Sequence, residues 1–365
     1  MNAKLTTDLA KQLAKYERVA LMLQGGGALG SYQVGVYQAL AEANCLPSWI
    51  CGVSIGAING AIIAGNAPDK RLAKLQEFWS LVTSREVMPA FSGLATMMMG
   101  QPGFFQPNIV SPWFAMQGSQ AATSYYDTSD LHKTLNKLID FERLNSGETR
   151  LSVGAVNVGT GDNVFFDTQK ERLCAEHIMA SGALPPALPM VKIGDAYFWD
   201  GGIVSNTPLQ YLLDEEDDKS SLVFQVELFK AAGAIPETMQ QVETRQKDIT
   251  YSSRTRQATH GFKNALALRS KLAEAYKRIP AAKLSAAEKK LMRDYADAGV
   301  VNLIQMIYQS KLDESGNKDY EFSKSTMEAH VAAGYADAVK TLSHTDWLDK
   351  PSAAQGVAFH RLHID

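Results

Sequence analysis

A serine between two glycines could act as a nucleophile in this chain. The segment GVSIG at 52–56 fits the pattern G-x-S-x-G, in which a sharp turn between a strand and a helix lifts a serine hydroxyl above a sheet. Residues 49–53 form an apolar run typical of a buried strand, and the small and apolar residues that follow suit a buried helix. The pattern predicts that Ser54 is a nucleophile for acyl transfer, with Gly52 and Gly56 as the glycines that allow the turn.

An aspartate later in the chain could serve as the base that this serine needs. A serine hydroxyl is a poor nucleophile until a neighbouring group accepts its proton. Asp200 ends an apolar run and is followed at once by Gly201 and Gly202, which is typical of a carboxylate presented at a turn. Phe198 and Trp199 beside it would disfavour the charged form by desolvation, which makes a stronger base than in water. We expect Asp200 to be the proton acceptor of a Ser-Asp pair.

A glycine-rich loop near the start of the chain could bind a negative charge. The segment LMLQGGGALG at 21–30 fits G-x-G-x-x-G, which in nucleotide-binding proteins cradles a pyrophosphate. Such sites need an acidic residue about 20 residues further on, and here Ser54 follows the next strand instead. Backbone N–H groups can also hold the oxyanion of acyl transfer, which lowers the barrier by roughly 3–4 kcal/mol. We expect this role for Gly25, Gly26 and Gly27, with Gly30 as a further motif glycine.

Other residues could be the base, or the motif residues could be structural. A histidine is the usual partner of a serine nucleophile, so a late histidine such as His344 or His360 would give a Ser-His-Asp triad. None of the seven histidines stands in a glycine-rich turn, and we expect His177 to be structural. Asp167 and Asp195 are rival acids, and the serine could simply cap a helix. The remaining histidines are His132, His260, His330 and His363.

The composition is that of an ordinary globular protein. Of the 365 residues, 45% are hydrophobic and 21% are charged. The net charge of −3 says little about partners, and we expect no nucleic acid among them. Cys45, Cys51 and Cys174 form neither a disulfide pattern nor a zinc pattern, which favours a reducing compartment. The chain lacks the apolar stretch of a signal peptide and any run of roughly 18 apolar residues. We expect a cytoplasmic protein that needs no metal and no organic cofactor.

Strands and helices alternate over the first 230 residues, which predicts a layered α/β domain with a largely parallel sheet. From Pro236 on the pattern becomes mostly helical, with a capping box at 285–288 and one further strand at 300–308. We expect a lead-in helix at 1–17, a catalytic domain at 18–235 and a mostly helical extension at 236–365. The expected strands are 18–23, 48–53, 150–158, 162–168, 190–193, 196–200 and 221–228, and the expected helices are 32–43, 54–66, 130–140 and 174–182.

Two segments could contact lipid. Segment 87–126 mixes glycine and proline with aromatic residues and methionines, and it is either core packing or a pliable lipid-facing lid; we favour the lid. Between 237 and 283 ten basic residues stand against four acidic ones. A solvated helix face is the simpler interpretation, and peripheral contact with an anionic membrane is the alternative. The apolar residues of the first segment are Met97, Met98, Met99, Phe91, Phe104, Phe105, Trp113 and Phe114.

The three motifs stand in an order that resembles the patatin-like phospholipase family. They are GGGALG at 25–30, GVSIG at 52–56 and DGGIVSNTP from Asp200, and the resemblance covers roughly residues 18–230. It implies a three-layer α/β/α sandwich, a Ser54–Asp200 dyad and an oxyanion hole at the glycine loop. Family members commonly have Asp before that loop and Arg or Lys before its last glycine, where this chain has Gln24 and Leu29. The helical extension is similar to that of a bacterial subgroup of the family.

The resemblance predicts an acyl ester hydrolase that acts on lipids through an acyl-enzyme. Two alternatives remain open at this point. One is an esterase of the α/β-hydrolase type with a Ser-His-Asp triad. The other is a lipid-binding or scaffold protein that keeps the fold without turnover.

Overall fold

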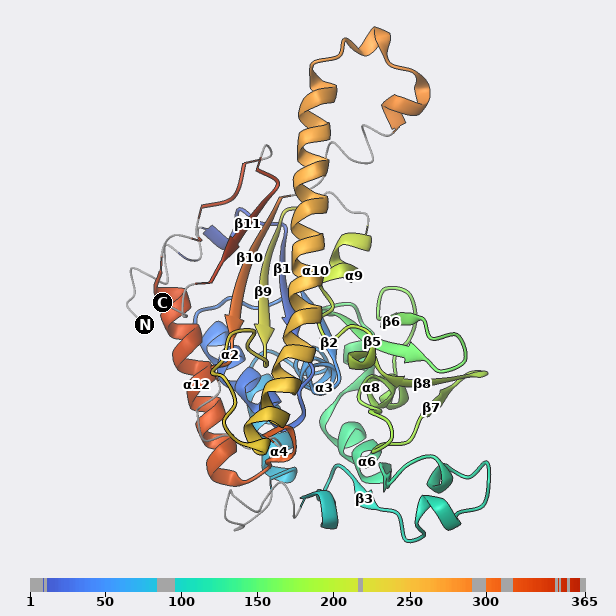
Figure 1. Ribbon diagram of the computed structural model, residues 1–365. Coiled ribbons are helices and arrows are strands. Elements are labelled where there is room, and N and C mark those ends of the chain that lie inside the picture. Colours follow the sequence, from blue (N-terminus) through green and yellow to red (C-terminus); the bar gives the residue numbers. More distant parts are fainter. Residues whose placement is uncertain are drawn as a thin grey trace.

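A sheet runs through the middle of the molecule. The computed structural model describes residues 9, 12–83, 96–215, 219–290, 300–309, 318–344, 347, 349–352 and 355–361. In this part of the chain the sheet has nine strands in the order β11-β10-β9-β1-β2-β5-β8-β7, with β6 paired to β5 (Figure 1). The parallel strands are β1 (Arg18–Leu23), β2 (Trp49–Val53), β5 (Arg150–Asn157), β9 (Ser221–Glu227), β10 (Val301–Ile307) and β11 (Val357–His360). The antiparallel strands are β6 (Asn163–Asp167), β7 (Val191–Ile193) and β8 (Ala196–Asp200).

Side chains alternate between two cores because successive residues of a strand point to opposite faces. Leu21 and Leu23 of β1 pack into the larger core, and Ala20 and Met22 pack into the smaller one. The larger core is covered by α2 (Ser31–Glu42), α3 (Ile55–Ala64), α4 (Arg71–Leu81), α6 (Ser129–Leu138), α7 (Phe141–Leu144), α8 (Ala175–Ser181) and α12 (Lys324–Ser343). The smaller core lies under α9 (Leu209–Asp214) and α10 (Met239–Lys277). The prediction of a three-layer α/β/α sandwich is confirmed.

The expected C-terminal extension shares the sheet of the first 230 residues. β10 pairs in parallel with β9, and β11 pairs with β10. α12 lies against α2 so closely that a Cβ on Gly35 would come within 1.9 Å of the Val331 carbonyl oxygen. The parts of the chain before and after the boundary expected at residue 235 therefore pack against each other. The single strand expected at 300–308 is β10, and β11 was missed because its four residues are too short to show a pattern.

Most expected elements within the described residues agree with the structure to within a few residues. The capping box is present, since Ser285 and Glu288 exchange side-chain to backbone hydrogen bonds. Most of the expected lead-in helix lies outside the described residues, as do Phe91 and the rest of 84–95. Residues 96–127 contain the short strands β3 (Gln106–Pro107) and β4 (Tyr126–Asp127), which pair with each other. That this segment acts as a lid stays a prediction.

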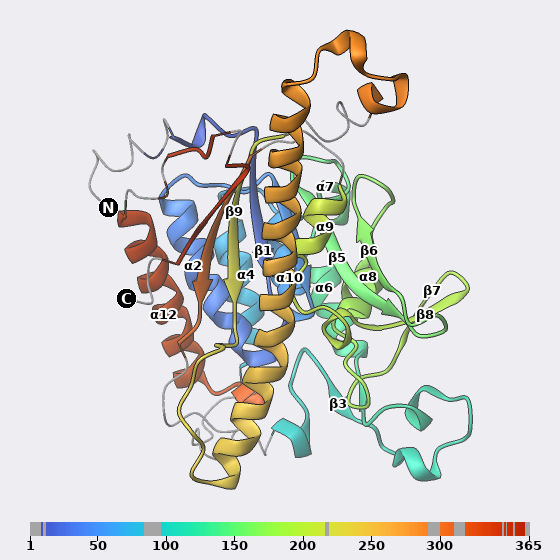
Figure 2. The same ribbon diagram turned by 45° about the horizontal axis from the view of Figure 1, so that its top comes forward.

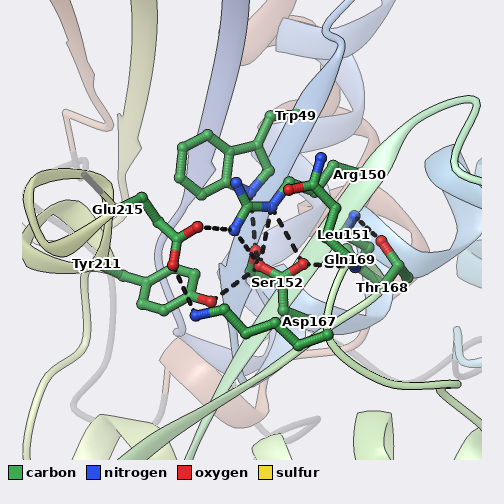
Figure 3. A network of polar contacts seen from close by, with 10 residues as sticks. Trp49, Arg150, Leu151, Ser152, Asp167, Thr168, Gln169, Tyr211 and Glu215 are labelled. Atoms are coloured by element: carbon green, nitrogen blue, oxygen red, sulfur yellow. Dashed lines mark hydrogen bonds and ion pairs between the residues drawn. The ribbon is translucent and has the colours of Figure 1, made fainter. Parts of the chain in front are cut away.

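A network of polar side chains joins β2, β5, β6 and α9 near the start of β5 (Figure 3). Asp167 is fully buried, accepts hydrogen bonds from Arg150 at 2.6–3.1 Å and accepts one from the Ser152 hydroxyl at 2.6 Å. The guanidinium of Arg150 also lies over the Trp49 ring and pairs with Glu215. Burial by itself would raise the pKa of Asp167, but the hydrogen bonds from Arg150 and Ser152 outweigh it and lower the pKa.

Replacing Asp167 by Asn should destabilise the fold by about 3 kcal/mol, because the buried Arg150 would lose its main counter-charge. Because the folded pKa of Asp167 is lowered, its stabilisation is present at neutral pH and is lost only as the pH falls through that lowered pKa. Chemical denaturation of both proteins measures the difference. The exposed pair of Arg172 with Glu142 gives the matched control, and Arg172→Ala should change stability by less than about 1 kcal/mol.

Candidate active site

Ser54 lies in a strained turn between β2 and α3. Its φ of 56° and ψ of −126° fall in a region that a residue with a side chain rarely adopts. The flanking glycines make the turn possible, since a Cβ on Gly52 would lie 2.4 Å from the Gly56 carbonyl oxygen. A Cβ on Gly56 would lie 2.3 Å from the Leu23 carbonyl oxygen. The G-x-S-x-G spacing thus lets α3 pack close to β1 and β2 while the serine stands at the turn.

The end of α8 holds this turn in place. The Ser54 N–H donates to the Ser181 carbonyl oxygen at 3.1 Å and to the Ser181 hydroxyl at 3.0 Å. That hydroxyl in turn donates to the Gly154 carbonyl oxygen of β5 at 2.6 Å. Just beyond α8, the Ala183 carbonyl oxygen accepts a hydrogen bond from the Asp200 N–H at 3.0 Å. One short segment therefore anchors the backbones of both Ser54 and Asp200.

Asp200 reaches the serine across β5. It pairs in register with Ala155 of β5, while Val53, the residue before the serine, pairs with Gly154. The chain then turns at Gly201, where a Cβ would lie 2.6 Å from the Gly154 carbonyl oxygen and 3.1 Å from Val53. Only a glycine fits this close crossing. This crossing brings the Ser54 side chain next to the Asp200 carboxylate, although 146 positions of sequence separate the two residues.

The carboxylate of Asp200 is almost sealed from water. Asp200 is 2% exposed, and its Oδ1 accepts a hydrogen bond from the Gly202 N–H at 2.7 Å. Desolvation by burial raises the pKa of Asp200 to about 6, and the hydrogen bonds from Ser54 and Gly202 limit the rise. At neutral pH the group is therefore mostly ionised and more basic than an exposed aspartate.

The glycine loop lies directly beside this pair. A Cβ on Gly25 would come within 2.8 Å of the Ser54 Cβ and 2.5 Å of the Asn206 Oδ1. Asn206 fixes the loop, because its Nδ2 donates to the Gly25 carbonyl oxygen at 2.9 Å. Within the described part of the chain, the N–H groups of Gly25 and Gly26 donate to no other residue. They remain able to bind an oxygen of a ligand.

Gln24 stands where the resemblance led us to expect an aspartate. Its side-chain oxygen accepts from the Leu228 N–H at 2.5 Å, and its Nε2 donates to the Thr255 hydroxyl at 2.9 Å. Gln24 therefore ties the start of the glycine loop to the end of β9 and to α10. Leu29 is fully buried in the larger core.

A largely apolar pocket contains the pair and the loop. Ser54 and Asp200 line it together with Gly202 and Asn206. Aromatic and aliphatic side chains make most of the remaining wall. The apolar lining residues are Ile55, Ile58, Phe104, Phe105, Tyr126, Leu184, Ala187, Leu188, Phe229, Tyr251, Tyr320 and Phe322. The pocket thus combines two groups for acyl transfer with a surface suited to an apolar chain.

The region beyond residue 236 supplies one wall of this pocket. Tyr251 comes from α10, and Asp319 and Tyr320 come from the short 3-10 helix η6 (Lys318–Tyr320). Two ion pairs fasten η6 to α10: Lys318 with Asp248, both nearly buried, and Lys247 with Asp319, each at 2.7 Å. The Asp319 carbonyl oxygen packs against Gly27, where a Cβ would lie 2.2 Å away and φ is +56°.

The rival bases lie elsewhere. Asp167 belongs to the network around Arg150, and Asp195 lies in the turn between β7 and β8. Among the described residues no histidine lines the pocket. His177 caps α8 through the Cys174 N–H, as expected of a structural residue, and His360 lies in β11 at the sheet edge.

The sequence analysis missed several residues of the site. Asn206 stands four residues after Gly202 of the DGG motif, so a polar residue in that turn was a usable signal. Ser181 precedes the glycine that ends α8 and could have been suspected as a backbone anchor. Tyr251, Tyr320 and Phe322 carry no motif and come from a part of the chain that the three motifs do not cover.

Comparison with known proteins gives two family matches. A model described as patatin-like phospholipase matches residues 21–213, and a second, described as patatin phospholipase, matches residues 249–354. Lysophospholipase nte1 of Aspergillus terreus is 25% identical over 195 residues, which are 53% of this chain and 11% of that protein. Triacylglycerol lipase SDP1L of Arabidopsis thaliana is 42% identical over 48 residues, which are 13% of this chain and 6% of that protein. The chain therefore spans a small part of the length of these relatives.

Among solved structures, VipD from Legionella pneumophila aligns with a TM-score of 0.43 and 16% identity, over 89% of this chain and 67% of that one. In the described residues, no helix is both long enough and apolar enough to span a membrane. The first family match covers more than half of the residues, and the chain therefore belongs to the patatin-like phospholipase family.

Proposed function

We propose that this protein hydrolyses acyl esters of lipids with Ser54 and Asp200 as a catalytic dyad. The observation that carries the proposal is that the serine side chain lies next to a buried carboxylate at the wall of an apolar pocket. Family membership and the lysophospholipase and lipase relatives support the same class of reaction.

The proposed reaction has two halves. In the first, Asp200 takes the proton of the Ser54 hydroxyl while its oxygen attacks the ester carbonyl carbon, and Asp200 then returns the proton to the departing alcohol. In the second, Asp200 takes a proton from water, the resulting hydroxide attacks the acyl-enzyme, and the proton returns to Ser54 as the fatty acid leaves. Both tetrahedral intermediates carry a negative oxygen, which the N–H groups of the glycine loop would bind.

The pocket wall favours a lipid ester over a small polar ester. Phe104, Phe105 and Leu188 on one side, with Phe229 and Phe322 on another, provide apolar surface for an acyl chain. Burying such a chain contributes about 0.8 kcal/mol per methylene group. A Ser-His-Asp triad is not favoured, because none of the described histidines lines the pocket.

The dyad is tested by two conservative substitutions. Ser54→Ala and Asp200→Asn should each lower kcat by a factor on the order of 10³ or more, because each removes a group that the chemistry needs. The measurement is hydrolysis of a phospholipid, a lysophospholipid and a triacylglycerol. A fluorophosphonate probe should label the wild type but not Ser54→Ala. His344→Ala and His360→Ala are the controls and should keep the activity of the wild type. Full activity of Asp200→Asn, or loss of activity in either histidine variant, would refute the dyad.

The pH dependence follows from the raised pKa of Asp200. Because the base must be ionised, kcat/KM for a soluble ester should be level above the folded pKa of about 6 and fall about tenfold per unit below it. Glu227 is a matched control, since burial also raises its pKa, to about 7, and it is not among the lining residues. Glu227→Gln should leave the midpoint in place. A midpoint at the ordinary pKa of an exposed aspartate would contradict the assignment.

The glycine loop is tested by adding one methyl group. Gly27→Ala should lower kcat by about 10²-fold, because the new Cβ meets the Asp319 carbonyl oxygen and must displace the N–H groups of the loop. Gly118 also has a positive φ but open space around it, so Gly118→Ala separates backbone strain from the steric effect. Thermal unfolding of both variants shows whether a loss of activity comes from a changed loop geometry or from a destabilised fold.

A further inference from the structure

One segment of the molecule exposes an unusual number of large apolar side chains. In residues 97–116, Trp113 and Phe114 are 83% and 86% exposed, and Ile109 is fully exposed. Met98, Met99 and Met116 are exposed by 70% or more. Single exposed apolar residues are common on protein surfaces, but a concentration of this kind marks an interaction surface. We call this segment the apolar loop.

The apolar loop contains no charge. No Asp, Glu, Lys, Arg or His occurs between Glu86 and Asp127, in a chain of which 21% of the residues are charged. Protein interfaces are enriched in arginine as well as in aromatic residues and methionine, and they have a polar rim. Insertion into the boundary between lipid headgroups and acyl chains favours Trp, Phe and other apolar residues and penalises charged groups. The composition therefore fits a lipid surface better than a protein partner.

The apolar loop is continuous with the pocket. Phe104 and Phe105 belong to it and line the pocket, and Tyr126 lines the pocket just beyond it. Tyr126 also ties the two together, because its hydroxyl donates to the Met97 carbonyl oxygen at 2.5 Å. A surface that contacted the apolar loop would therefore lie next to the pocket wall.

A second apolar segment lies at the same end of the molecule. Ile235 and Met239 are 88% and 75% exposed, and Val242, at 42%, follows in the first turns of α10. Both views of the ribbon place the start of α10 and the segment around β3 at the end toward which the parallel strands point (Figures 1 and 2). Phe229 and Tyr251, which flank this segment in the sequence, line the pocket. Two apolar segments thus border the pocket from different parts of the chain.

We propose that the apolar loop, with the segment at 235–242, docks the protein on an uncharged or zwitterionic lipid bilayer. Docking would bring the pocket to the lipid surface and, if the proposed function holds, let a lipid ester enter without crossing water. The interaction is apolar, so it needs no anionic lipid and resists salt. It differs from docking through the basic residues of α10, which would need anionic lipid and would weaken with salt.

Vesicle flotation tests the proposal without any turnover. The full chain should float with phosphatidylcholine vesicles, equally well at about 0.1 M and about 0.5 M salt, and the Ser54→Ala protein should float as well as the wild type. The double variant Trp113→Ala/Phe114→Ala should reduce the partition coefficient at least about tenfold, because two exposed aromatic side chains leave the lipid boundary. Leu268→Ala is the matched control, since Leu268 is 67% exposed in the distal half of α10, and its partition should stay unchanged.

Trp113 also gives a direct signal of contact. Of the five tryptophans, Trp49, Trp79 and Trp347 are buried and Trp199 is partly buried, so quenching of fluorescence by brominated phosphatidylcholine should come mainly from Trp113. Trp113→Phe should keep vesicle binding and lose most of the quenching.

Several outcomes would overturn the docking surface. They are no binding to phosphatidylcholine, binding that requires anionic lipid and disappears in salt, and a double variant that binds like the wild type. Self-association that the double variant abolishes, without vesicle binding, would assign the apolar loop to a second copy of the chain. Vesicle binding without ester hydrolysis would leave this inference intact and end the proposed function. Hydrolysis of a soluble ester without vesicle binding would refute this inference and leave the proposed function intact.

Discussion

The approach of the Ser54 side chain to the buried Asp200 carboxylate is the contact on which the site depends. Ser54 follows β2 and Asp200 is the last residue of β8, and β5 lies between these two strands in the sheet. The two residues meet only because the backbone crosses β5 at Gly201 with no room for a side chain. The end of α8 then anchors both backbones, through Ser181 on one side and Ala183 on the other. The geometry is thus held by main-chain contacts more than by the two side chains themselves.

This arrangement has an energetic cost that the rest of the fold must offset. Ser54 adopts a backbone conformation that costs on the order of 1–3 kcal/mol, and Asp200 keeps its charge in a place from which water is largely excluded. Residues in such conformations persist when packing over-determines them. Here the fully buried α3 supplies that packing. At the start of β5, by contrast, the buried Asp167 is neutralised by Arg150, which suits a structural carboxylate and not a base.

The local parts of the site could be predicted from the sequence because turn chemistry is local. Glycines at fixed offsets from Ser54 and Asp200 indicate sharp turns, and an apolar strand before each indicates that the turns end buried strands. The same logic predicted the parallel sheet and most of its elements. The wall made by Tyr251, Tyr320 and Phe322 could not be predicted, because it depends on where α12 and β10 bring a distant part of the chain. Strand pairing between distant segments, such as that of β10 with β9, likewise leaves no local pattern.

The central position of β1 has a consequence for how the molecule is made. Among the described strands β1 is made first. It pairs with β2 on one side, but its other neighbour, β9, ends only at residue 227, and β9 pairs in turn with the later strand β10. The nascent chain must therefore carry unpaired strand edges until β9 and β10 have been made, and unpaired edges favour aggregation. Because η6 is translated after all of these strands except β11, the pocket gains this wall only after most of the described sheet has been made.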